Sequence, residues 1–158
     1  MLSIVVIFAS RLLLVLLFLP FSALDKVLNF KQSLAQASRA VLAPWPATLL
    51  VLAGFSIEVV MSLAILSGVA DRLAAFILAG YCLITAILWK QFWRTPDFRL
   101  RGESGGRELF WDFMKNAALA GGFLMLAFGT GASGVRRFVD HPLRSSHPYS
   151  VIDESVLQ

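Results

Sequence analysis

The sequence contains four apolar blocks, each long enough to cross a lipid bilayer as a helix. They cover about residues 2–24, 47–66, 72–93 and 108–128. A hydrocarbon core of about 30 Å requires about 20 helical residues, which rise about 1.5 Å each. Apolar residues form 58% of the chain and charged residues 15%, whereas soluble domains have roughly 45–50% and about 25%. The sequence therefore predicts an all-α integral membrane protein and excludes an ordinary soluble enzyme or a disordered chain.

The connections between the blocks predict a four-helix transmembrane bundle. Residues 67–71 form a turn so short that the second and third blocks must be antiparallel neighbours. Residues 25–42 are polar but carry apolar side chains three and four apart, which predicts an amphipathic helix between the first two spans. That helix either lies in the membrane interface or packs as a plain connector on the mouth of the bundle. Residues 131–158 form a polar C-terminal tail, expected to lie on the surface or to be partly disordered.

Basic residues are distributed unevenly over the two sides of the predicted bundle. Four spans place both termini on one side, which carries four basic residues, against eight on the opposite side. The positive-inside rule therefore places the termini outside and the more basic side in the cytoplasm. The formal charge of +4 fits a membrane surface better than nucleic acid, because the basic residues lie in short loops beside apolar spans. Membrane lipids are therefore expected partners, and nucleic acid is not.

The few cysteine and histidine residues limit redox and metal chemistry. Cys82 is the single cysteine, and both histidines, His141 and His147, lie in the tail. A dithiol mechanism is excluded, and the spans lack the histidines that a haem or zinc site would need. No metal site or other intrinsic cofactor is expected, and any redox cofactor would be a quinone or belong to a partner subunit.

One charged residue lies deep inside each of the first two predicted spans, where charges are costly. Arg11 and Glu58 each lie about eight residues, or about 12 Å, from the same side of the bundle. This matching depth predicts a buried ion pair, in which the guanidinium offers two donors to the carboxylate. The pair would either fix the register of the helices or form part of a ligand or proton site.

A second polar group is predicted on the opposite side of the bundle. It consists of residues at the ends of the first and third spans and in the first turns of the fourth, namely Lys26, Lys90, Asp112, Lys115 and Asn116. One interpretation is local pairing and anchoring, because Asp112 and Lys115 are three residues apart and lysines snorkel to the interface. The alternative is a pocket roofed by Trp111 and the amphipathic segment. Such a pocket would suit a quinone or a lipid head group, because it joins hydrogen-bond donors to an apolar corridor.

Three sets of residues together resemble one family of membrane proteins. The first set is an arginine followed by an apolar run that ends in lysine, namely Arg11, Phe18 and Lys26. The second combines a glutamate helix with a glycine-to-arginine turn, namely Leu52, Ala53, Gly54, Glu58, Gly68, Arg72, Ala74 and Ala75. The third is a closing polar and glycine-containing helix, namely Phe113, Lys115, Asn116, Ala118, Leu119, Gly121 and Gly122. In this order and spacing, residues 10–128 resemble the DoxX family of small bacterial and archaeal membrane proteins.

The resemblance implies a four-helix transmembrane bundle in a prokaryotic inner membrane. Its signature polar positions would be Arg11, Lys26, Glu58, Arg72, Lys115 and Asn116. The family is named after a subunit of a terminal quinol oxidase, and relatives are linked to thiosulfate-to-quinone electron transfer and to membrane oxidoreductase assemblies. This sequence departs from the family pattern at Ser22 and Ala23, where glycine is usual, in its charged third loop and in its long tail. These departures leave the expected fold intact but weaken the transfer of a specific substrate.

Three functions are compatible with the sequence. The leading one is an accessory, non-catalytic subunit of a respiratory or other oxidoreductase complex, with other subunits as partners and a quinone or lipid site. The second is a quinone-reactive membrane enzyme that works with a soluble donor protein. The third is a small permease or channel, which is disfavoured because no inverted repeat is visible.

Overall fold

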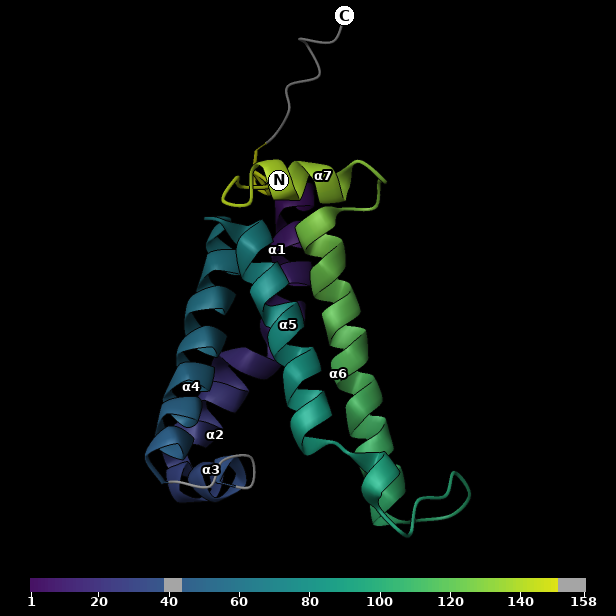
Figure 1. Ribbon diagram of the computed structural model, residues 1–158. Helices are drawn as coiled ribbons and strands as arrows, with labels where there is room; N and C mark the ends of the chain where they lie inside the picture. The colour runs from purple at the N-terminus through teal and green to yellow at the C-terminus, as the bar shows by residue number, and fades with distance from the viewer. Residues whose placement is uncertain (39–43, 151–158) are drawn as a thin grey trace, which may run out of the picture.

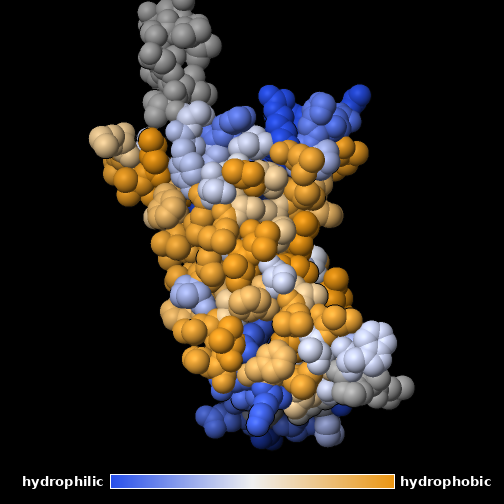
Figure 2. Space-filling model, turned by 90° about the vertical axis from the view of Figure 1, so that its left-hand side faces the viewer, coloured by the Kyte–Doolittle hydropathy of each residue, from blue (hydrophilic) through white to orange (hydrophobic). Residues whose placement is uncertain are grey.

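Helices form all of the regular structure in residues 1–38 and 44–150, the part of the chain that the computed structural model describes (Figure 1). The prediction of an all-α fold is therefore confirmed for these residues. In chain order the helices are α1 (Leu2–Val15), η1 (Leu17–Ser22), α2 (Ala23–Leu28), α3 (Phe30–Ala37), α4 (Pro44–Ser67), α5 (Asp71–Trp89), η2 (Phe92–Arg94), α6 (Gly105–Phe128) and α7 (Gly134–Asp140). Three segments are long and apolar enough to cross a membrane, namely residues 2–28, 45–67 and 71–94. Figure 2 shows a broad apolar surface between two hydrophilic ends.

The first of these segments is bent in its middle. Leu19 has non-helical dihedral angles (φ −123°, ψ 112°) and directly precedes Pro20. Proline has no N–H to donate and disfavours a helical conformation in the residue before it. The chain therefore changes direction at this point, and α2 turns to lie beside α4 (Figure 1).

The turn between α4 and α5 makes these two helices antiparallel neighbours, as the sequence predicts (Figure 1). Gly68 and Ala70 adopt left-handed conformations there, with φ of +78° and +48°. Glycine adopts such angles without steric cost, which explains its place in so short a turn.

The shared core lies between α1, α4, α5 and α6. Its largest fully buried apolar side chains come from three of these helices, namely Ile65, Leu78 and Phe123. Five buried alanines, Ala74, Ala75, Ala79, Ala120 and Ala127, lie on α5 and α6. Small side chains let helix backbones approach closely, so α5 and α6 pack along their length.

The fourth long helix, α6, is as long as α4, with 24 residues each. It is not among the three segments that qualify as membrane spans, because charged residues such as Glu108, Asp112 and Lys115 lie in its first half. It begins three residues before the predicted residue 108. The Oγ of Ser104 accepts a hydrogen bond from the N–H of Arg107 (3.2 Å), which satisfies one of the unpaired donors of the first turn.

The predicted amphipathic segment contains α3. Leu34 and Ala37 of its apolar face pack against Ala47 and Val51 at the start of α4, whereas Phe30 is largely exposed. The segment therefore packs on the mouth of the bundle, while its location at a membrane interface stays a prediction. Its last part, with Arg39, lies outside the described residues.

The tail folds over one end of the bundle up to residue 150, beyond which it is outside the described residues. Helix α7 lies across that end (Figure 1), and Phe138 packs on the rings of Phe76 and Phe128 with centroid distances of 5.2 Å each. Gly134 begins α7, and a Cβ there would lie 1.7 Å from the carbonyl oxygen of Phe128. Docking of α7 therefore requires glycine at this position.

A Gly134→Ala variant should undock α7. The added methyl group overlaps backbone rather than a movable side chain, so the free energy of unfolding in detergent should fall by about 1–3 kcal/mol. Thermal unfolding and limited proteolysis of the tail measure this effect. The matched control is Gly131→Ala, because a Cβ at Gly131 meets nothing within 4 Å. Equal protease resistance of the two variants would contradict the packing described for α7.

Candidate functional site

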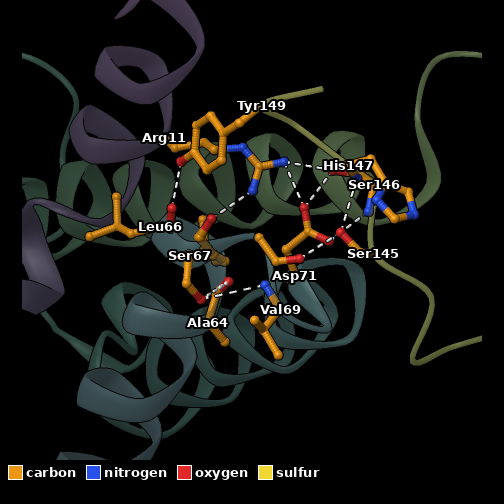
Figure 3. A network of polar contacts seen from close by, with 12 residues as sticks. Arg11, Ala64, Leu66, Ser67, Val69, Asp71, Ser145, Ser146, His147 and Tyr149 are labelled. Carbon is orange, nitrogen blue, oxygen red and sulfur yellow. Dashed lines mark hydrogen bonds and ion pairs between the residues drawn. The ribbon is translucent and has the colours of Figure 1, made fainter. Parts of the chain in front are cut away.

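A buried ion pair joins α1 to the start of α5. An Nη2 nitrogen of Arg11 donates to the Oδ2 of Asp71 at 2.6 Å, and the Arg11 side chain is 6% exposed against 0% for Asp71. Nη1 of Arg11 donates to the backbone carbonyl of Ile65 in the last turn of α4 (2.6 Å). In Figure 3 the Arg11 guanidinium and the Asp71 carboxylate point toward one another. This pair therefore links α1, α4 and α5.

The tail completes this network. Ser146 donates to Asp71 through its backbone N–H (2.9 Å, to Oδ1) and its Oγ (2.5 Å, to Oδ2), and its Oγ also accepts from Arg11 (2.8 Å). Nearby, the hydroxyls of Ser145 and Tyr149 donate to the backbone carbonyls of Gly68 and Leu66 (Figure 3). The Asp71 carboxylate thus has hydrogen bonds on both oxygens although it is fully buried.

The predicted pair between Arg11 and Glu58 is wrong. Arg11 lies level with the last turn of α4 and the first residue of α5, because it bonds to Ile65 and Asp71. The first turns of α1 therefore run beside the docked tail, where Phe8 contacts the ring of Tyr149. The prediction counts the depth of Arg11 from the first apolar residue of the chain. This count places Arg11 farther from the end of the bundle than it lies.

Glu58 is instead the centre of a second cluster, with a side chain that is 2% exposed. Lys26 donates from Nζ to both carboxylate oxygens, at 2.7 Å and 2.8 Å. Ser22 (3.1 Å) and the hydroxyl of Tyr81 (2.8 Å) donate to Oε1. Lys26 reaches Glu58 because the bend at Leu19 carries α2 toward α4.

Sequence reasoning missed Asp71, Ser146, Ser22 and Tyr81 as partners in these clusters. The pattern predicts Asp71 as the last residue of a short turn, whereas it is the first residue of α5 and is fully buried. A charge count contained the signal for it, because the segment of residues 2–28 holds two cations, Arg11 and Lys26, whereas residues 45–67 hold one acid, Glu58. The roles of Ser22, Tyr81 and Ser146 had no such signal, since hydroxyl residues occur throughout the chain.

A cavity of about 670 Å³ opens beside Glu58. Its walls come from η1, α2, α3, α4, α5 and α6, and α4 and α5 diverge toward this end of the bundle (Figure 1). Most of the wall is apolar, including Leu17, Phe18, Leu50, Ile57, Ile84 and Leu88. The polar lining includes Lys26, Glu58, Tyr81, Lys90, Asp112, Lys115 and Asn116. Five residues of the predicted polar group therefore line one cavity.

The rim of this cavity contains a local charge network. Asp112 accepts from Lys90 at 2.8 Å and from Lys115 at 3.3 Å. Lys115 is the more exposed of the two donors, because its side chain is 74% exposed against 31% for Lys90. Within the described part of the chain, the side-chain amide of Asn116 makes no hydrogen bond. Lys115 and Asn116 thus retain donors for a group that enters the cavity.

The predicted roof by Trp111 is not formed, because Trp111 does not line the cavity and is 49% exposed. One residue along a helix turns the side chain by about 100°, so Trp111 faces away from the direction of Asp112. Trp89 lines the cavity instead, and its indole N–H donates to the backbone carbonyl of Gln36 in α3 (3.2 Å). The amphipathic segment does line the cavity, through Ser33, Gln36 and Ala37.

Gly68 and Arg72, the glycine and arginine of the predicted glycine-to-arginine turn, lie at the end of α5 that is farther from the large cavity. Gly68 forms the tight connection from α4, and Arg72 lies in the first turn of α5. The Nε of Arg72 is buried and has no hydrogen-bond partner within the described residues. Arg72 lines a second, smaller cavity under the tail.

Comparison with known proteins places the chain in a family. The model of the DoxX family matches residues 6–91, more than half of the chain. The chain belongs to the DoxX family. No curated protein and no solved structure matches it. The match extends over both buried ion pairs of this DoxX protein but ends before Asp112, Lys115 and Asn116.

A double-mutant cycle should show strong coupling between Arg11 and Asp71. Asp71→Leu alone leaves a buried guanidinium without its counter-charge, so it should lower the free energy of unfolding by about 3–5 kcal/mol. The double variant Arg11→Met and Asp71→Leu should lose less than the single one. Unfolding in detergent measures each free energy. The matched control is the cycle of Arg11 with Glu58, whose effects should add because the two share no partner. Additive effects in the first cycle would rule out the pair.

Proposed function

We propose that this DoxX protein is an accessory subunit of a membrane oxidoreductase complex, whose large cavity holds the head group of a quinone or lipid. In this proposal α1, α4, α5 and α6 all cross a prokaryotic inner membrane, as a four-helix bundle. The cavity of about 670 Å³ carries the proposal, because it combines apolar walls with unused hydrogen-bond donors.

The residues of the cavity fit a quinone. A quinone ring needs apolar contact and its carbonyl oxygens need donors, and when bound it supplies an acceptor for two electrons and two protons. Phe18 and Ile57 offer apolar contact inside the cavity. Leu17 and Ile84 line the cavity and are also more than half exposed, at 51% and 58%. They would let an apolar ligand tail extend from the cavity into the lipid.

Within the predicted polar group, donors with free capacity remain on Lys90, Lys115 and Asn116, and of these Lys115 is the most exposed. All three N–H groups of the Lys26 ammonium have acceptors, two on Glu58 and one on Ser22, and the Tyr81 hydroxyl already donates to Glu58. The inner cluster therefore holds the cavity wall in place, while Lys115 and Asn116 would contact a carbonyl or phosphate oxygen of the ligand.

An accessory role is favoured by the residue content of the spans. The two histidines lie in the tail, and the spans hold one cysteine. The bundle thus lacks a ligand set for haem or an iron–sulfur cluster. Electrons would reach or leave a bound quinone through a partner subunit.

Purification of the tagged protein at native expression in mild detergent tests this role. Mass spectrometry, an optical spectrum and an organic extract for quinone are the measurements. Partner subunits with haem or flavin absorption are the expected result. Bound quinone without any partner would instead favour a quinone-reactive enzyme, and neither quinone, lipid nor partner would refute the proposal.

Lys115→Ala and Asn116→Leu should each lower bound ligand about three- to tenfold, because each removes a hydrogen-bond donor. The readout is quinone or lipid per protein after purification, together with labelling by a photoreactive short-chain quinone. Lys31→Ala is the matched control, since Lys31 is exposed on α3 and does not line the cavity. Equal loss in all three variants would show that the ligand is not retained by contacts inside the cavity.

A further inference from the structure

The smaller cavity lies under the tail, at the opposite end of α5 from the large one. Its volume is about 280 Å³, far more than the roughly 10–15 Å³ that one water molecule needs. Its lining comes from the first turn of α5, from α7 and from the segment after α7, namely Arg72, Arg137, His141, Arg144, Ser145, Ser146 and His147. Three arginines and two histidines thus surround one space, and none of the described acidic residues lines it.

The three arginines keep their positive charge available. Within the described part of the chain, Arg72, Arg137 and Arg144 form no ion pair. The buried Nε of Arg72 also lacks any hydrogen-bond partner among these residues. A buried donor without an acceptor is costly unless a ligand or water supplies one.

Two described acidic residues, Asp71 and Asp140, are adjacent in sequence to residues that line this cavity, and both pair with cations outside the lining. Asp71 lies next to Arg72 in sequence, but its oxygens accept from Arg11 and Ser146. The acidic residue of α7, Asp140, pairs through its Oδ2 with the Nε of Arg136 at 3.9 Å, and Arg136 does not line the cavity. Among the described residues, the cavity therefore gathers positive charge that no carboxylate compensates.

We propose that this cavity binds a phosphate group, carried by a phospholipid head group or by free phosphate. Guanidinium groups bind phosphate oxygens through paired donors, and three of them would balance a multiply charged anion. The imidazoles of His141 and His147 would add further N–H donors. The cavity lies beside the tail, at one end of the bundle, and Figure 2 shows hydrophilic ends that border a broad apolar surface. In a bilayer, such a border would lie near the depth of the lipid phosphates. The inference does not depend on a quinone in the large cavity.

Native mass spectrometry and calorimetry test this site on the full-length protein. In one arm, protein from nanodiscs that contain phosphatidylglycerol and phosphatidylcholine is analysed for retained lipid. In the other arm, inorganic phosphate is titrated into protein in a phosphate-free maltoside detergent. Retention of phosphatidylglycerol alone identifies the lipid as the source, and binding of inorganic phosphate identifies the free ion.

Arg137→Gln should weaken whichever binding is observed about tenfold, because one charge-assisted contact is removed. Arg136→Gln is the matched control, because it removes the same charge one residue away, outside the cavity, from a side chain that is 89% exposed. Thermal unfolding of both variants verifies that the fold is retained. The proposal is overturned by absence of binding in both arms, or by equal weakening in the two variants.

Discussion

The burial of Asp71 is the constraint on which the arrangement of this protein depends. A carboxylate with no exposed surface is tolerated only when a counter-charge and hydrogen bonds replace its water. The counter-charge comes from Arg11 on α1, and the remaining donors come from Ser146 in the tail. One side chain therefore fixes α1 against the connection from α4 to α5 and holds the tail over the same end.

A second charge pair imposes a comparable constraint on the other half of the first span. Glu58 lies within an apolar helix and needs a cation, and the bend at Leu19 allows Lys26 to reach it. A straight helix would direct Lys26 along the axis of α1 and away from α4. The bend thus both satisfies Glu58 and places η1 and α2 in the wall of the large cavity. The bend at Leu19 therefore accounts both for the buried pair of Lys26 and Glu58 and for the large cavity beside it.

Composition and periodicity were sufficient to predict the long helices of this fold but not the pairing of their charged side chains. Apolar length identified the helices, and the short turn at Gly68 identified α4 and α5 as antiparallel neighbours. The partner of Arg11 could not be deduced, because depth depends on how far α1 extends beyond the other helices, which is a property of tertiary packing. Docking of α7 was equally hidden, since it rests on the close approach of Gly134 to a backbone carbonyl rather than on an apolar pattern.

The polar group at the large cavity was predicted because its residues lie at helix ends that topology brings together. Lys90, Lys115 and Asn116 indeed line one space, whereas Trp111 does not, since sequence adjacency to Asp112 says nothing about the shared face of a helix. The rotation of about 100° per residue decides which neighbour faces inward.

The family match divides these residues into two groups with different consequences. Both ion pairs, Arg11 with Asp71 and Lys26 with Glu58, lie within residues 6–91. The donors left free at the two cavities lie mostly beyond that range, in α6 and in the tail. The fold of the matched segment therefore depends on charged side chains whose hydrogen-bonding partners lie within the protein. Ligand contact would depend on other polar side chains, which the fold does not require. Loss of a ligand-contacting side chain should then leave the framework intact, because no buried counter-charge is abandoned.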